Sequence, residues 1–161
     1  MELGIVGLGR MGQIVVNRCL DAGHEVAAFD LDPAAVATAA EAGATPAESV
    51  ADLTDRLGDG RRIWLMVPAG DAVDATLGDL EPQLNADDVV VDGGNSHFQE
   101  SVRRAEATAA AYLDCGTSGG PAGAALGFSL MIGGPEWAYE AMVPVFDAVA
   151  TGPAGHDRMG P

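Results

Sequence analysis

The sequence predicts an α/β fold built on a doubly wound parallel sheet, and two observations lead to this prediction. First, apolar segments of strand length alternate with amphipathic segments of helix length along the chain, as expected of a sheet covered by helices on both faces. Second, runs such as Val89–Val91 are apolar throughout, which is typical of strands buried on both faces of a parallel sheet.

Six apolar segments have the length of strands, and the doubly wound arrangement places them in the order 3-2-1-4-5-6. They are Leu3–Val6, Glu25–Asp30, Ile63–Val67, Val89–Asp92, Tyr112–Cys115 and Ser129–Ile132.

The helices between these strands have recognisable starts and stops. The first, Met11–Ala22, ends before Gly23, a residue type common just beyond helix ends. The second has Asp32 as N-cap and Pro33 in the first helical position. Three further signals are the capping pairs Ser49 with Asp52 and Ser96 with Gln99, and the helical segment Glu136–Ala150. Residues 151–161 have the composition of a loop.

Length and composition suit one ordinary domain spanning residues 1–161. The chain is 48% hydrophobic, which is enough for a core of its own. No apolar run approaches the length of a membrane span, and strand-like sequence begins directly after Met1, so we expect a cytoplasmic protein. The two cysteines have no metal-type spacing, so no metal site is expected, and Cys19 is predicted to be a small buried hydrophobe.

The charge balance is strongly acidic. Asp and Glu number 24 against 8 basic residues, a formal net charge of −16, and every basic residue is an arginine. Such a surface repels nucleic acid and anionic membranes, so neither is an expected partner. Self-repulsion of this size needs screening by salt, and lysine is normally among the commonest residues. We therefore expect a halophilic source rather than an acidic mesophilic protein that lacks lysine by chance.

The spacing Gly7, Gly9 and Gly12 comes straight after the first strand and opens the first helix. In a G-x-G-x-x-G loop the glycines permit a tight turn, a close approach to a pyrophosphate and close packing of helix on strand. Asp30, at the end of the second strand, stands where an acidic residue binds the ribose hydroxyls, and its charge favours NAD over NADP. Alternatively, Asp30 is a solvated strand-end residue, or part of a helix cap with Asp32. The sheet is thus predicted to be of the Rossmann type.

Three more loops are expected at the same edge of the sheet, where ligands of such folds collect. The first contains small residues, the second two glycines and an asparagine, and the third a serine followed by two glycines, which suits a nest for an anion. Taken singly, the first loop could be a simple strand-to-helix turn. The asparagine of the second loop could merely stabilise its own turn. The residues are Val67, Pro68 and Ala69, then Asn95, then Ser118, Gly119 and Gly120.

Together these motifs resemble 6-phosphogluconate dehydrogenase of the shorter bacterial and archaeal type, within the β-hydroxyacid dehydrogenases. The resemblance covers essentially the whole chain, in order. It is carried by Gly7–Gly12, Trp64–Gly70, Asp92–Ser96, Gly116–Gly120, and Gly123-Ala124 followed by Gly127–Gly134.

The resemblance implies oxidation of 6-phosphogluconate at C3 with NAD(P)⁺ and loss of CO₂ to give ribulose 5-phosphate. NADP-using members have an Asn-Arg-Thr-like stretch after the second strand, and Phe29–Asp32 lacks that arginine, which supports NAD. The implied cofactor-binding residues are Gly7, Gly9, Arg10, Met11, Gly12, Asp30, Val67, Pro68, Ala69 and Asn95. The implied substrate-binding residues are Asn95, Ser118, Gly119 and Gly120, with Asn95 and Ser118 in positioning roles only.

The family's general base is a lysine and its acid a glutamate, both in a helical second domain, and this chain has no lysine. We therefore expect a cofactor-binding domain without that second domain, inactive alone and monomeric or weakly associated, whereas the whole protein is expected to be a homodimer. His24 is predicted to occupy an exposed loop, and His97, beside Asn95, is not assigned proton transfer.

Two other functions fit parts of the same pattern. Another β-hydroxyacid dehydrogenase, such as one acting on 3-hydroxyisobutyrate, would share the hydride chemistry without a phosphate to recognise. A stand-alone dinucleotide-sensing domain would need the glycine loop and Asp30, but not the Gly93–Ser96 and Ser118–Gly120 loops.

Overall fold

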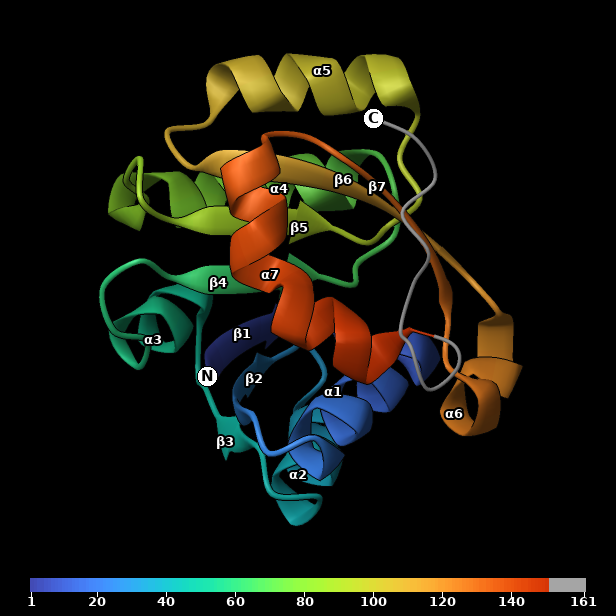
Figure 1. The fold of residues 1–161 in the computed structure, drawn as a ribbon. Coiled ribbons are helices and arrows are strands. Elements are labelled where there is room, and N and C mark those ends of the chain that lie inside the picture. The colour runs from blue at the N-terminus through green and yellow to red at the C-terminus, as the bar shows by residue number, and fades with distance from the viewer. Residues whose placement is uncertain (151–161) are drawn as a thin grey trace.

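The computed structural model describes residues 1–150, which form a central sheet with helices on both faces (Figure 1). In chain order the elements are β1 (Glu2–Val6), α1 (Arg10–Asp21), β2 (Glu25–Phe29), α2 (Pro33–Glu41), β3 (Thr45–Pro46), α3 (Val50–Asp55), β4 (Arg62–Leu65), α4 (Asp71–Leu80), a 3₁₀ turn (Glu81–Gln83), β5 (Val89–Asp92), α5 (Phe98–Ala107), β6 (Ala111–Ser118), a second 3₁₀ turn (Gly120–Ala122), α6 (Gly123–Leu126), β7 (Ser129–Gly133) and α7 (Glu136–Val149).

The sheet has seven strands in the order β3-β2-β1-β4-β5-β6-β7, so the prediction of six strands is wrong by one. The additional strand, β3, pairs with the outer side of β2 through Ala27↔Thr45 and Ala28↔Pro46. The Ile63 segment, predicted as the third strand, is therefore the fourth, and pairs with β1. With β3 in third place, the predicted order 3-2-1-4-5-6 describes the first six strands.

The seventh strand also corrects the prediction of a fully parallel sheet. β7 pairs antiparallel with β6, from Asp114↔Gly133 to Ser118↔Ser129. The connection between them contains only short helical turns, whereas a parallel return needs a crossover of about a dozen residues or more. β6 is also longer than predicted, because residues 116–118 continue the strand.

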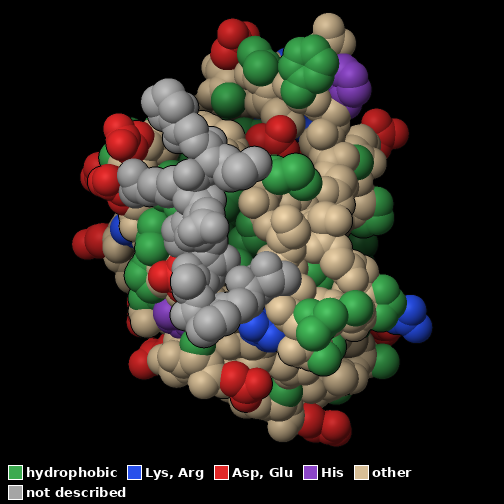
Figure 2. Space-filling view, turned by 45° about the vertical axis from the view of Figure 1, so that its right-hand side comes forward, with side chains coloured by type: hydrophobic (Ala, Val, Ile, Leu, Met, Phe, Trp, Pro, Cys, Tyr) green, Lys and Arg blue, Asp and Glu red, His purple; other side chains and the backbone are tan. Residues whose placement is uncertain are grey.

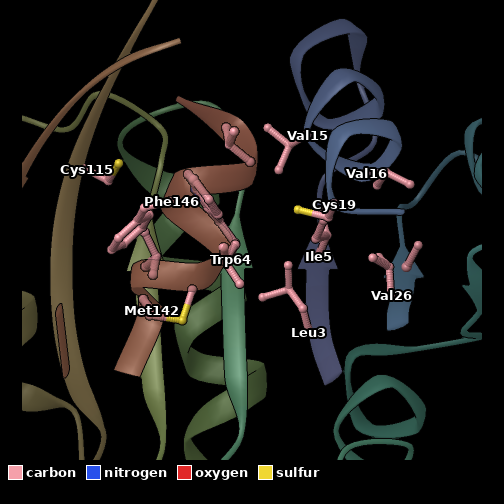
Figure 3. Close-up of a cluster of buried hydrophobic side chains, with 14 of the residues drawn as sticks. Leu3, Ile5, Val15, Val16, Cys19, Val26, Trp64, Cys115, Met142 and Phe146 are labelled. Atoms are coloured by element: carbon pink, nitrogen blue, oxygen red, sulfur yellow. The ribbon is translucent and has the colours of Figure 1, made fainter. Parts of the chain in front are cut away.

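Two hydrophobic layers hold the helices to the sheet. Figure 3 shows one layer, in which Val15 and Cys19 of α1 and Phe146 of α7 pack toward Leu3 and Trp64 of the sheet. Cys19 has no exposed surface, as predicted. The other layer, under α3 and α4, includes Leu53, Ile63, Val73, Leu77 and Leu80. Successive residues of a strand point into one layer and then the other, and both layers are apolar. The strands therefore read as continuous apolar runs rather than as alternating apolar and polar residues.

The helix α5 is attached to the sheet by polar rather than apolar side chains. Its buried residues are Ser101 and Arg104, whereas Phe98 and Val102 are 65% and 55% exposed. Its N-cap is His97, whose Nδ1 accepts a hydrogen bond from the Gln99 N–H at 3.3 Å. The predicted cap, Ser96, has different partners, described below. The predicted caps of the two earlier helices, Asp32 and Ser49, are confirmed.

The helices among residues 1–150 include none with the length and apolar character needed to cross a membrane. The predicted last helix is confirmed as α7, and the loop predicted for residues 151–161 lies outside the described residues.

Candidate functional site

The glycine loop lies between β1 and α1, at the edge where the parallel strands end (right-hand side of Figure 1). Gly7 has φ +95°, and a Cβ there would lie 2.7 Å from the Met66 carbonyl oxygen. A Cβ at Gly12 would overlap the carbonyl oxygen of Gly7. Gly7 and Gly12 thus have the structural roles predicted for them, a turn and a close helix–strand contact.

Gly9 differs from the other two glycines because a Cβ there would meet nothing within 4 Å. It is the N-cap of α1, and no side chain caps that helix end. The first N–H groups of a helix lack partners within the helix and lie at the positive end of its dipole. Arg10, the first residue of α1, is exposed and adds a positive charge. This backbone can therefore receive an anion such as a pyrophosphate.

Asp30 ties the end of β2 to the glycine loop. Its Oδ2 accepts a hydrogen bond from the Leu8 N–H at 2.5 Å, and its Oδ1 accepts one from the Asp32 N–H at 2.8 Å. Asp32, and not Asp30, caps α2 by accepting from the Ala34 N–H at 2.9 Å. A carboxylate has about four lone-pair sites, so two remain for ligand hydroxyls.

The loops after β4 and β5 pack directly on one another. A Cβ at Gly93 would lie 2.7 Å from Met66 Sδ and would overlap the Trp64 indole nitrogen, and one at Gly94 would lie 2.7 Å from the Val67 carbonyl oxygen. The two glycines of the β5 loop therefore allow its backbone to approach the neighbouring β4 loop closely. Pro68 and Ala69 of that loop are exposed. Figure 2 turns the right-hand side of Figure 1 forward, and backbone and uncharged side chains predominate in the middle of that view.

Asn95 joins the β5 loop to the end of β6. Its Oδ1 accepts from the Thr117 N–H at 2.9 Å, and its Nδ2 donates to the Thr117 carbonyl at 3.4 Å. It has φ +58°, unusual for a residue other than glycine. The loop-stabilising alternative for Asn95 is therefore realised in the structure. The same contacts bring Asn95 beside Ser118, the next residue of β6.

The Ser118–Gly120 turn is exposed at Ser118 and Gly119, and both glycines have positive φ, +140° and +51°. The turn is held by Phe128, which is fully buried. A Cβ at Gly119 would lie 3.3 Å from the Phe128 ring, and one at Gly123 would overlap it. The glycines therefore let the chain wrap around this ring and leave backbone N–H groups at the surface.

A buried ionic cluster beneath these loops was not predicted from the sequence. Asp92 and Arg104 are almost fully buried, and the Tyr112 hydroxyl donates to Asp92 Oδ2 at 2.5 Å. Ser96 Oγ donates to the same oxygen at 2.6 Å and accepts from Arg104 Nη1 at 2.9 Å. Burial raises the pKa of the Tyr112 hydroxyl, so it stays protonated and acts as a donor.

Arg104 also connects this cluster to α4. Its Nε donates to Asp74 Oδ1 at 2.9 Å and its Nη2 to the Gly70 carbonyl at 3.2 Å. Hydrogen bonds from Arg104 and then Arg103 lower the pKa of Asp74 to about 2. The only sequence signal was a pair of arginines inside an otherwise polar helix, and their partners lie far away along the chain.

The two histidines differ from one another. His24 is half-buried in the turn after α1, where its ring nitrogens lie 3.4 Å from the Met1 nitrogen and 3.2 Å from the Pro144 carbonyl. It is thus less exposed than predicted, because α7 and the N-terminus pack around it. His97 is exposed and caps α5. Among residues 1–150, no group of three or more His, Cys, Asp or Glu residues is arranged to hold a metal ion.

The sheet order and the glycine loop define a Rossmann-type domain. A family model described as the NAD binding domain of 6-phosphogluconate dehydrogenase matches residues 2–156. The chain belongs to this family, the NAD-binding domains of 6-phosphogluconate dehydrogenases.

Curated relatives and solved structures agree with this family. The chain is 78% identical, over 160 residues, to "6-phosphogluconate dehydrogenase, NAD(+)-dependent, decarboxylating" of Haloferax volcanii, covering 99% of this chain and 54% of that protein. It thus spans about half the length of this relative. A Plasmodium falciparum 6-phosphogluconate dehydrogenase structure matches with a TM-score of 0.85 and 26% identity, over 96% of this chain and 35% of that one. A 3-hydroxyisobutyrate dehydrogenase from Salmonella typhimurium matches with a TM-score of 0.84 and 28% identity over 94% of this chain and 54% of that one.

Proposed function

We propose that this chain is the NAD-binding part of an enzyme that oxidatively decarboxylates 6-phosphogluconate to ribulose 5-phosphate and CO₂. The observation that carries the proposal is the glycine loop tied to Asp30, in a chain 78% identical to an NAD(+)-dependent 6-phosphogluconate dehydrogenase. NAD⁺, when bound, accepts the hydride that leaves C3 of the substrate.

The adenosine and pyrophosphate end of the cofactor is assigned to the first two strands. The N–H groups of the α1 start take the pyrophosphate, and Asp30 takes the ribose hydroxyls with its remaining lone pairs. A 2′-phosphate at the same place would be repelled by the carboxylate, so NAD is favoured over NADP. The residues of this half of the site are Gly7, Gly9, Arg10, Met11, Gly12 and Asp30.

The nicotinamide and substrate end is assigned to the middle of the sheet. Val67, Pro68 and Ala69 border the cofactor there, and Asn95 lies between cofactor and substrate. Ser118 and the N–H groups of Gly119 and Gly120 offer donors to a substrate carboxylate. Each of these residues binds or orients the cofactor or the substrate, and none is assigned proton transfer.

Proton transfer is assigned to a part of the enzyme beyond this chain. The chain contains no lysine, and His97 is engaged as a helix cap. We place the general acid and base in a second, helical domain, which would also form the homodimer of a cytoplasmic enzyme. The strongly acidic composition of this chain, which is 78% identical to a relative from Haloferax volcanii, fits a cytoplasm rich in salt.

The cofactor assignment predicts selectivity that depends on Asp30. NADH is expected to bind this chain more tightly than NADPH in molar KCl, measured by the fluorescence of the reduced nicotinamide. Asp30→Asn keeps an oxygen for the Leu8 N–H but removes the charge, so the affinity ratio should shift toward NADPH by about tenfold.

Asp32→Asn is the matched control for this titration. It removes the same charge two residues away and keeps an oxygen to cap α2, so it should change the ratio far less. Tighter binding of NADPH by the parent chain would overturn the role of Asp30. Binding of neither nucleotide would contradict the proposal that this chain holds the dinucleotide.

The assignment of proton transfer predicts that this chain alone forms no NADH from 6-phosphogluconate and NAD⁺. A spectrophotometric assay at 340 nm would measure it, with the full-length Haloferax volcanii relative as the positive control. Turnover by this chain would show that its own residues supply the acid and base.

A 3-hydroxyisobutyrate-type activity is the second candidate, because solved structures of that class match with TM-scores of 0.82 and 0.84. The two enzymes would differ in phosphate recognition. A substrate panel on the full-length protein would distinguish them.

A further inference from the structure

We propose that Asp92 is a positioning residue of this site: its buried carboxylate fixes the turn that carries Asn95, and so controls binding at the nicotinamide end of the cofactor. The inference rests on the proposed function, because it needs a dinucleotide that runs from the glycine loop to the β5 loop.

The carboxylate of Asp92 clamps the turn from both sides. Asp92 is the last residue of β5, and its Oδ1 accepts from the Gly94 N–H at 2.9 Å. Its Oδ2 accepts from Ser96 Oγ at 2.6 Å. Asn95 stands between these two contacts with φ +58°, a conformation that surrounding contacts must enforce.

Asp92 is itself held rigidly. Its side chain is fully buried, and Tyr112 and Arg104 reach Oδ2 at 2.5 and 3.5 Å from β6 and α5. A buried carboxylate with several donors has one favourable orientation, because any other leaves a buried polar group unpaired. The turn therefore takes its geometry from the sheet and from α5.

The clamp reaches the substrate end through Asn95. With the turn fixed, the Asn95 amide meets the Thr117 N–H and carbonyl, at 2.9 and 3.4 Å. Ser118 follows directly in β6. The relative position of Asn95 and Ser118 therefore depends on Asp92. The glycine loop, by contrast, is fixed by Asp30 from β2, and β4 separates β1 from β5.

This separation gives the proposal a test that simple loss of stability would not imitate. NADH and ADP-ribose share the adenosine and pyrophosphate, but only NADH has the nicotinamide. We expect Asp92→Asn to weaken NADH about tenfold in molar KCl, by calorimetric titration, while ADP-ribose stays within about twofold. The carboxamide oxygen can still accept the hydrogen bond from the Gly94 N–H. The NH₂ group, however, is itself a donor and would face the Ser96 and Tyr112 hydroxyls, which donate to the carboxylate in the parent chain.

Asp88→Asn is the matched control. Asp88 directly precedes the same strand, at its other end, and is also fully buried. It accepts from the Arg61 N–H at 2.6 Å and from Arg61 Nη1 at 3.3 Å. This variant removes a buried, arginine-paired carboxylate far from the proposed site, so it should lower stability without changing the ratio of the two affinities.

Three outcomes would overturn the proposal: equal loss of both ligands in Asp92→Asn, no loss of either, or a parent chain that binds NADH no more tightly than ADP-ribose. If Asp92→Asn does not fold, Ser96→Ala decides, because it removes one donor of the clamp and should weaken NADH selectively by a few-fold. A parent chain that binds neither ligand would instead refute the proposed function.

Discussion

Replacing Gly12 with alanine is expected to lower the free energy of unfolding by about 2–3 kcal/mol and to abolish NADH binding. A Cβ at this position would overlap the carbonyl oxygen of Gly7. The oxygen belongs to the backbone and the Cβ has a fixed position on its Cα, so neither atom can rotate away, and α1 must move off β1. That movement would open the apolar contacts of Val15 and Cys19 with the sheet. Denaturant unfolding in molar KCl measures the loss.

Gly9→Ala separates the fold from the ligand. Gly9 has φ −63°, which alanine adopts readily, and a Cβ there would meet nothing within 4 Å. Stability should stay within about 0.5 kcal/mol of the parent chain. NADH should nevertheless bind more weakly, because the methyl group occupies space through which the pyrophosphate approaches the backbone. Unchanged NADH binding in this variant would show that the ligand lies elsewhere, and an unchanged midpoint for Gly12→Ala would contradict the close packing.

The parts of the fold that could be predicted from the sequence are those determined by residues close together along the chain. The glycine loop depends on three residues within one turn, and each apolar strand is recognisable from its own composition. β3 was missed because Thr45–Pro46 has neither length nor an apolar run, and only its pairing with β2 makes it a strand. The direction of β7 was missed because it depends on the path of the preceding connection, not on the composition of Ser129–Gly133.

The candidate site was predictable to a similar degree. The glycine loop and the three other loops were found from their residues, but the contacts that shape them were not. The spacing of Ser96 to Gln99 fits a capping pair and therefore predicts that Ser96 caps the helix. In the structure Ser96 instead contacts Asp92, at the end of a strand, and Arg104, inside a helix. Arg103 and Arg104 are adjacent residues of the same type, so the sequence cannot show which of them is buried. Only their positions in the folded chain distinguish them.

That difference gives the second large effect: Arg104→Leu is expected to lower the free energy of unfolding by about 3–5 kcal/mol. The Arg104 side chain is 1% exposed and donates to Asp74, Ser96 and the Gly70 carbonyl. Leucine can fill part of the volume, but it leaves the buried carboxylate of Asp92 without its cation. Salt does not screen a buried pair effectively, so the loss should persist from low to molar KCl in denaturant unfolding at pH 7.

Arg103→Leu is the control for this variant, because it removes the neighbouring charge at a surface position. Arg103 is 53% exposed and pairs with Asp74 and Glu100. Exposed pairs contribute about 0–1 kcal/mol and are screened by salt, so this variant should be nearly neutral in molar KCl. Equal losses in the two variants would contradict the distinction between a buried and a surface pair.

The pH dependence of unfolding offers a second readout of the same pair of variants. Both arginines lower the pKa of Asp74 from 3.8 to about 2, with the hydrogen bond from Arg104 as the largest cause. A carboxyl whose pKa is lower in the folded state stabilises the fold above its unfolded pKa, and this contribution is lost as the pH falls toward about 2. In Arg104→Leu the pKa of Asp74 should return toward 3.8, so stability should fall less steeply between pH 4 and pH 2 than in the parent chain. Arg103→Leu should reduce that slope by less, because Arg104 still donates to Asp74 Oδ1. An acid slope unchanged in Arg104→Leu would show that Asp74 does not owe its low pKa to the buried arginine.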